Sequence, residues 1–154
     1  MRGVIYAEQE NLEKALEDFD RVLAIDPEDY DRMIDIYCVL NANGYKESGQ
    51  NYLKNAMANG TKGMTNYEKG RISFYLEDYE NARNYLERVK DSEGKEAVLF
   101  LGRTYETLGD HNYAISVYNN CNTFSIRSGY SIGDIIHCII LRNAGIPIPI
   151  VFER

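Results

Sequence analysis

Histidine and cysteine, the side chains that most often do chemistry near neutral pH, are scarce in this chain. They occur only at His111 and His137 and at Cys38, Cys121 and Cys138. A histidine beside a cysteine could activate a thiolate, and a cluster of the two types could ligate zinc. His137 and Cys138 are adjacent in a helix-like segment, where neighbouring side chains point about 100° apart, so they form no catalytic pair. No cysteine pair has zinc-site spacing, so the sequence predicts reduced, mostly buried thiols and no catalytic site, metal or cofactor.

The net charge of the chain disfavours some classes of binding partner. Over 154 residues it carries a net charge of -7 and is 44% hydrophobic, which is ordinary for a soluble folded protein. Nucleic-acid binding needs a basic stripe, and attachment to an anionic membrane needs a basic cluster, so both are disfavoured. The longest apolar stretch, near the C-terminus, is interrupted by polar residues and two prolines and predicts no membrane insertion. We therefore interpret the acidity as serving solubility and expect a protein or peptide partner.

A pattern of small and large residues recurs about every 34 positions. Gly102 is followed twelve residues on by Ala114 and four further by Tyr118. The same frame occurs three more times: Gly3 with Ala15 and Phe19, Tyr37 with Gly49 and Leu53, and Gly70 with Ala82 and Leu86. So many matches predict a repeat array, which must be stacked because one unit cannot bury its own apolar face.

Each repeat contains two amphipathic helices joined by a tight turn. A glycine inside a helix costs roughly 1 kcal/mol relative to alanine. We expect closer helix packing to offset this cost, with Gly102 lying against Ala114 and Tyr118 filling space toward the next unit. The predicted helices span residues 1–7, 12–24, 30–42, 45–58, 65–76, 79–90, 95–107 and 111–122.

This pattern resembles the tetratricopeptide repeat (TPR) family. The residues that carry the resemblance are Gly3, Tyr6, Ala15, Phe19 and Pro27 in the first unit and Leu101, Gly102, Tyr105, Gly109, Ala114 and Tyr118 in the last. The resemblance implies an all-α, right-handed solenoid of about four helix pairs. The array spans 1–122, with units near 1–29, 30–62, 63–94 and 95–122. Because Gly3 holds the eighth position of its unit, we expect a truncated first unit and a longer parent array or an upstream leader.

The resemblance also implies a concave groove, lined by the first helix of each pair, in which a partner peptide lies. The carried-over groove positions are Asp31, Ile34, Asp35, Cys38 and Asn41 in unit two, Tyr67, Glu68, Arg71, Phe74 and Tyr75 in unit three, and Glu96, Leu99, Phe100, Arg103 and Glu106 in unit four. From these we select eight candidate partner-binding residues: Asn41, Tyr67, Arg71, Phe74, Tyr75, Phe100, Arg103 and Glu106. Arg71 and Arg103 hold the same repeat position, so we expect them side by side.

Two neighbouring guanidinium groups flanked by aromatic rings could clamp a carboxylate. The alternative is that each arginine pairs with a nearby carboxylate of the chain, such as Glu68 or Glu106. The Lys and Asn pattern of chaperone-tail-binding TPR domains is absent from this groove.

The C-terminal segment, residues 123–154, is rich in isoleucine. Apolar residues at 132, 135, 136, 139 and 140 lie on one face of a helix, and Pro147 and Pro149 prevent that helix from continuing. We expect a capping helix on the last repeat followed by an extended tail. A contact between copies of the chain, or with a domain outside it, stays open.

These observations favour a non-enzymatic protein–protein interaction scaffold that binds a partner segment in its concave face. The alternative is a structural spacer that associates with itself through residues 123–154. The cysteine usage favours a reducing compartment such as the cytoplasm. An exported or membrane-anchored parent protein stays open if the chain is a fragment.

Overall fold

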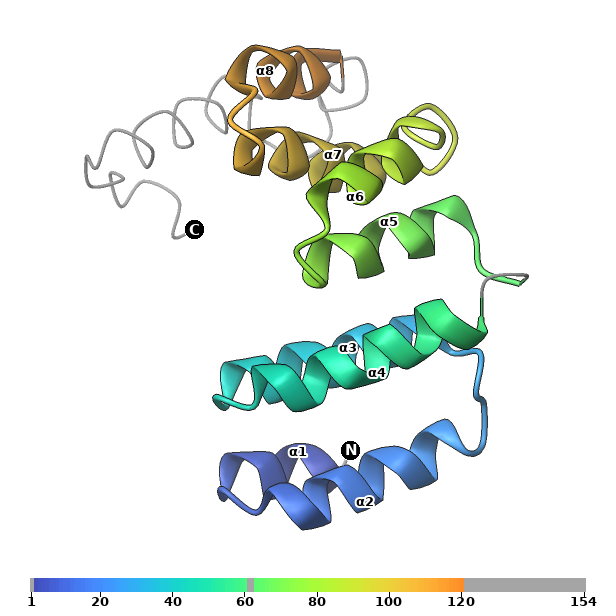
Figure 1. Ribbon diagram of the computed structural model, residues 1–154, viewed down its shortest axis with the longest axis vertical. Helices are drawn as coiled ribbons and strands as arrows, with labels where there is room; N and C mark the ends of the chain where they lie inside the picture. The colour runs from blue at the N-terminus through green and yellow to red at the C-terminus, as the bar shows by residue number, and fades with distance from the viewer. Residues whose placement is uncertain (1, 61–62, 121–154) are drawn as a thin grey trace, which may run out of the picture. The chain divides into compact units, whose positions relative to one another are not determined.

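The computed structural model describes residues 2–60 and 63–120, and this part of the chain consists of helices joined by turns and loops, without strands (Figure 1). Each helix lies where the sequence places it, so the all-α prediction is confirmed. The predicted capping helix and tail, residues 123–154, lie outside the described residues. The helices are α1 (Arg2–Glu8), α2 (Leu12–Leu23), α3 (Tyr30–Ala42), α4 (Lys46–Asn59), α5 (Asn66–Tyr75), α6 (Tyr79–Glu87), α7 (Lys95–Thr107) and α8 (His111–Asn120).

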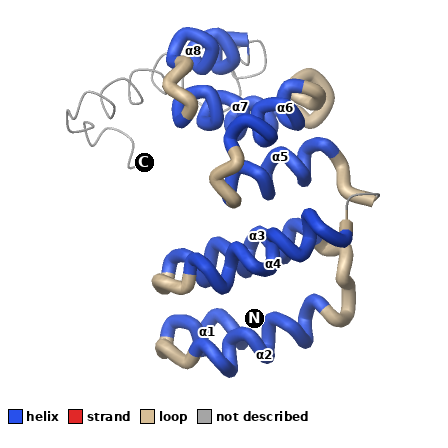
Figure 2. The backbone as a smooth tube through the Cα atoms, viewed as in Figure 1, coloured by secondary structure: helices blue, strands red, loops and turns tan. Residues whose placement is uncertain are grey.

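The helices pack most extensively in consecutive pairs, which are α1/α2, α3/α4, α5/α6 and α7/α8. The chain divides into two compact units, Met1–Val89 and Lys90–Arg154. In the first unit, α3 contacts both α1 and α2, and α5 contacts both α3 and α4, so its three pairs stack (Figure 2). The fourth pair belongs to the second unit. Paired helices that stack in this way are the architecture of a helical solenoid.

Helix α3 shows why the pairs must stack, because it is buried on two sides. Ile36 and Leu40 lie in a core with Phe19 of α2, whereas Ile34 lies in a second core with Ile72 of α5. All five side chains are at most 2% exposed. A helix with apolar residues on both faces needs a neighbour on each side, which the pairs before and after α3 provide.

The turn inside each pair contains one residue with a positive φ, at the same place in the repeat. These residues are Glu10 (φ 59°), Gly44 (85°), Glu77 (66°) and Gly109 (81°). The backbone N–H of the next residue donates to the carbonyl five residues back, as from Asp110 to Tyr105 at 2.9 Å. This is the left-handed helix ending that glycine favours, and it reverses the chain between the paired helices.

The repeat glycines lie against the large residue of the partner helix. A Cβ on Gly3 would fall 2.7 Å from the ring of Phe19, and one on Gly70 would fall 2.6 Å from Leu86. For Gly102 the nearest atoms are those of the Tyr118 ring, which lie closer than any atom of the expected partner, Ala114. The large residue therefore fills the space over the glycine of its own pair, where the sequence predicted that it would fill space toward the next unit.

The second repeat exchanges these roles between its helices. Gly49, on α4, lies against Tyr37 on α3, with the missing Cβ position 3.1 Å from the tyrosine ring. The small residue is thus on the second helix and the large one on the first. The close approach of the two helices is kept, which explains how the pair forms with the two types in reversed positions.

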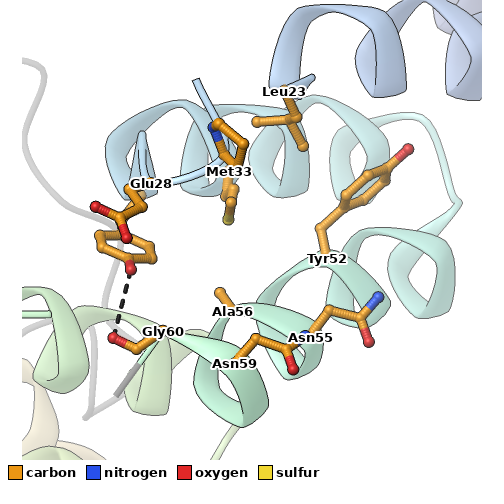
Figure 3. Close-up of a pocket in the computed structure, with 10 residues that line it drawn as sticks. Leu23, Glu28, Met33, Tyr52, Asn55, Ala56, Asn59 and Gly60 are labelled. Atoms are coloured by element: carbon orange, nitrogen blue, oxygen red, sulfur yellow. Dashed lines mark hydrogen bonds between the residues drawn. The ribbon is translucent and has the colours of Figure 1, made fainter. Parts of the chain in front are cut away.

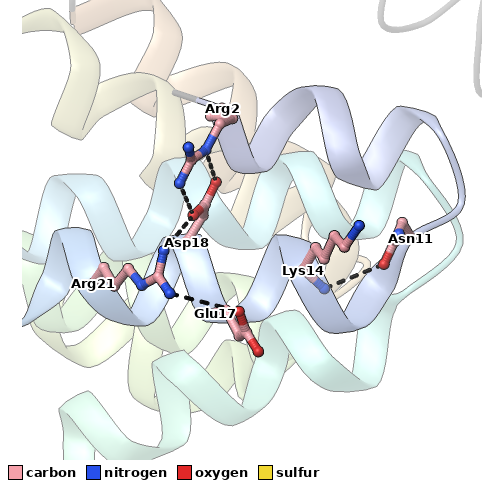
Figure 4. Close-up of polar contacts among 6 residues, drawn as sticks. All are labelled: Arg2, Asn11, Lys14, Glu17, Asp18 and Arg21. Atoms are coloured by element: carbon pink, nitrogen blue, oxygen red, sulfur yellow. Dashed lines mark hydrogen bonds and ion pairs between the residues drawn. The ribbon is translucent and has the colours of Figure 1, made fainter.

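Polar contacts join the first pair (Figure 4). Arg2 of α1 donates two hydrogen bonds of 2.7 Å to the carboxylate of Asp18 on α2. Arg21 lies 3.5 Å from the same carboxylate. The hydrogen bonds from Arg2 hold the pKa of Asp18 below its usual range. Asn11 caps α2 by accepting from the backbone N–H of Lys14 at 3.3 Å.

Candidate partner-binding site

The expected site residues of the first unit lie on α3 and α5, the first helices of consecutive pairs. Helix α5 begins with a capping box, in which Thr65 accepts from the N–H of Glu68 and the Glu68 carboxylate accepts from the N–H of Thr65 at 2.7 Å. Helix α3 is capped by Asp29, which accepts from the N–H of Arg32 at 2.9 Å. These caps fix where the helices begin, and the buried side chains between them fix their rotation.

Arg71 joins the two helices. Its guanidinium donates to the carboxylate of Asp31 on α3 and lies 5.2 Å from the centre of the Tyr67 ring. The Arg71 side chain is 18% exposed, whereas that of Asp31 is 72% exposed. Arg71 therefore pairs with a carboxylate of the chain, as the alternative predicted, and the carboxylate is that of Asp31. A guanidinium held between a ring and a carboxylate has a fixed orientation.

An aromatic cluster continues along α5. Phe74 meets both Tyr75 and Tyr79 edge to face, with ring centroids 5.7 and 5.6 Å apart. Tyr75 also lies 5.1 Å from Tyr37 on α3. Phe74 and Tyr75 are half-buried, so they are anchored on the protein side and still present surface to solvent. Such rings offer contact area with little loss of side-chain freedom on binding.

Other expected groove positions differ in exposure. Ile34 is buried in the core, so it does not line a surface. Asn41 is exposed near the end of α3, about 15 Å along the helix axis from Asp31. Cys38 is exposed, contrary to the expectation of a buried thiol. Partial desolvation raises the pKa of Cys38, although a hydrogen bond with Tyr75 opposes this shift, so the thiol stays protonated near neutral pH.

The remaining candidates lie on α7, in the second unit. Phe100 and Glu106 are half-buried, and Arg103 is exposed. Burial, followed by the charge of Glu106, raises the pKa of Tyr118. Arg71 and Arg103 belong to different units, so their side-by-side placement stays a prediction.

The histidine and cysteine side chains that lie in the described ranges, His111 and Cys38, form no catalytic or metal-binding cluster there. His111 is exposed at the start of α8. Across residues 2–60 and 63–120, no group of three His, Cys, Asp or Glu side chains could hold a metal ion. In the same ranges no helix is long and apolar enough to cross a membrane. His137, Cys121 and Cys138 lie outside the described residues.

Sequence reasoning missed a hollow between α2 and α4. One cavity of about 340 Å³ is lined by residues of α2, α3 and α4, among them Leu23, Met33 and Asn59 (Figure 3). A second, of about 230 Å³, adjoins it. The signal was present as asparagines four residues apart at positions 51, 55 and 59. These positions lie on α4, the second helix of its pair, whereas the expected groove is lined by the first helices.

Comparison with known proteins decides the family. Tetratricopeptide repeat models match residues 1–29, and again residues 65–95 and 96–124. The chain belongs to the tetratricopeptide repeat family. The TPR resemblance of the sequence is thereby confirmed, and it supports a role as a protein-interaction scaffold. Proteins of this family are typically non-enzymatic.

A solved structure agrees with the TPR fold. The crystal structure of MamA is similar, with a TM-score of 0.54 and 20% sequence identity, over 93% of this chain and 84% of that one. At this identity the likeness bears on the fold alone. No curated protein gave a significant match to the sequence.

Proposed function

We propose that this TPR chain binds an extended segment of a partner protein on the surface formed by α3 and α5. We call this surface the α3–α5 face and define it by Asp31, Asn41, Tyr67, Arg71, Phe74 and Tyr75. The observation that carries the proposal is the guanidinium of Arg71, held between Tyr67 and Asp31 beside the half-buried rings of α5. Tyrosine and arginine are enriched among the residues that contribute most to binding at protein interfaces, and this surface presents both.

The rings supply affinity and Arg71 supplies orientation. Phe74 and Tyr75 exclude water from apolar side chains of the partner. Arg71 donates to a carboxylate of the partner in place of that of Asp31, whose exposed side chain returns to solvent at little cost. The partner segment is therefore expected to place an acidic residue next to apolar ones.

We include the α7 residues Phe100, Arg103 and Glu106 as a further contact of the same partner. The exposed guanidinium of Arg103 and the partly exposed ring of Phe100 offer the same combination of chemistry on the second unit. Each arginine then contributes separately to binding.

Charge reversal of the arginines tests the proposal. The partner is captured on the tagged chain and identified by mass spectrometry, and capture is then compared for Arg71→Glu, Arg103→Glu and the double variant. We expect each single variant to weaken capture and the double variant to abolish it, with the helical circular dichroism unchanged. The matched control is Arg83→Glu on α6, which also removes an arginine paired with a carboxylate, Glu80. Undiminished capture by the double variant, or equal loss in the control, would overturn the proposal.

A further inference from the structure

Two cavities with shared walls lie one after the other along the second helices of the first and second pairs. The larger, of about 340 Å³, and the smaller, of about 230 Å³, share Tyr52 and Asn55 as lining residues. We call this feature the α2–α4 groove. It is separate from the α3–α5 face, because none of its lining residues belongs to that face, although the first turn of α3 contributes to its wall. The open space between Leu23, Met33 and the asparagines of α4 is visible in Figure 3.

A row of three amides lines the α4 side of this groove. Asn51, Asn55 and Asn59 are exposed, and each lines one or both cavities. Residues four apart on a helix share a face and rise by about 6 Å. Two residues of an extended peptide advance by about 6.6 Å, so successive asparagines reach every second peptide unit. Since each amide can both donate and accept, one asparagine can serve the N–H and the C=O of the same residue.

We propose that the α2–α4 groove binds an extended, basic peptide segment through this row. The lining residues include two carboxylates, Asp20 and Glu28, and no lysine or arginine. The Tyr52 hydroxyl donates to Asp20 at 2.7 Å and so holds that carboxylate at the wall of the groove. Asp20 lines the smaller cavity and Glu28 the larger, and both residues are exposed, so a lysine or arginine of the segment pairs with a carboxylate at the rim of each cavity.

The apolar lining completes the match to an extended chain. Leu16 lies in the smaller cavity, and Leu23, Met33 and Ala56 lie in the larger. Side chains of an extended peptide point alternately to opposite sides. The side facing the groove floor is therefore apolar, and the basic residues lie between those positions and reach the carboxylates. The basic residues of this segment distinguish it from the acidic segment expected at the α3–α5 face.

The test is a nuclear magnetic resonance titration of the full chain with octapeptide libraries. In the first library lysine is fixed at alternate positions and the other positions are randomised. In the second, glutamate replaces lysine. In the third, the lysine peptides carry N-methyl groups at every second amide, which removes backbone donors. We expect the first library alone, at millimolar concentration, to shift the side-chain amide resonances of Asn51, Asn55 and Asn59.

Variants separate the groove from the rest of the surface. Asn55→Ala combined with Asn59→Ala is expected to weaken binding of the lysine library by about tenfold. The control is Asn84→Ala, an exposed asparagine on α6 that lines neither cavity. An absence of amide shifts with the first library, equal shifts with the second or third, or equal weakening in the control would overturn this proposal. None of these outcomes depends on Arg71, so they leave the α3–α5 face untouched.

Discussion

Gly102 of α7 lies directly beneath the ring of Tyr118 on α8. A Cβ at Gly102 would overlap the ring carbons, and Tyr118 itself is 4% exposed, so the ring has little room to retreat. The same contact joins Gly3 to Phe19 and Gly70 to Leu86, each sixteen residues on. The glycine is therefore the surface on which the large residue of the second helix rests, and this explains why it is kept inside a helix.

Replacement of Gly102 by alanine is expected to destabilise the chain by about 1–3 kcal/mol, because the overpacking outweighs the better helix propensity of alanine. Urea unfolding measures the effect, with Arg103→Ala, an exposed position on the same helix, as the control. Since both changes act on one contact, Gly102→Ala should cost less in a Tyr118→Ala background. If Gly102→Ala instead stabilised the chain, the added methyl group would not be overpacked against the Tyr118 ring, and the explanation would be wrong.

At the left-handed turn positions a substitution is expected to stabilise the chain, in contrast to Gly102→Ala. Glu10 has φ 59° in a position where the second and fourth repeats have glycine. Glu10→Gly is expected to stabilise the chain by about 1 kcal/mol, because glycine adopts this backbone without strain. Thermal unfolding checks it. Gly109→Glu should lower stability by a similar amount, and two changes of the same sign would contradict the explanation. Glu77 is less suitable, because its carboxylate also pairs with Lys46.

The Arg2–Asp18 contact predicts a dependence of stability on pH. Hydrogen bonding by Arg2 lowers the pKa of Asp18 in the folded chain, so folding favours the charged carboxylate. Its contribution is complete above the ordinary aspartate pKa of about 3.9 and is lost as the pH falls through the lower folded value. Urea unfolding of the wild-type chain and Asp18→Asn should differ most at pH 7, and the difference should shrink toward pH 2. A difference in unfolding free energy that stayed constant from pH 7 to pH 2 would contradict this role of Asp18.

The pairing of Arg71 predicts a gain of binding. If Asp31 competes with a carboxylate of the partner, Asp31→Asn should tighten binding by up to about fivefold. Calorimetric titration with the captured partner measures the change. Asp35→Asn, which removes an exposed carboxylate one turn further along α3, is the matched control. Weaker binding by Asp31→Asn would mean that Asp31 itself contacts the partner.

The helices could be predicted closely, because the spacing of apolar residues and the Asn, Asp and Gly turn signals are local in sequence. The contact of Gly102 with Tyr118 could not, since the spacing does not give the stagger of two helices. Arg71 and Asp31 are forty residues apart. Their pairing depends on the register between two helix pairs, which the repeat frame alone does not determine. The asparagine row of α4 was readable from sequence, but its cavity required the structure.

The most direct test of the α3–α5 face is crosslinking from Tyr67. The chain is expressed in its own cells with a photoreactive phenylalanine analogue at Tyr67 or, as a control, at Tyr113 on α8, which is 60% exposed. We expect irradiation to attach a single partner to the Tyr67 position, and we expect Arg71→Glu to remove that product. Crosslinking of the partner from Tyr113 with none from Tyr67, or a Tyr67 product unaffected by Arg71→Glu, would contradict the account.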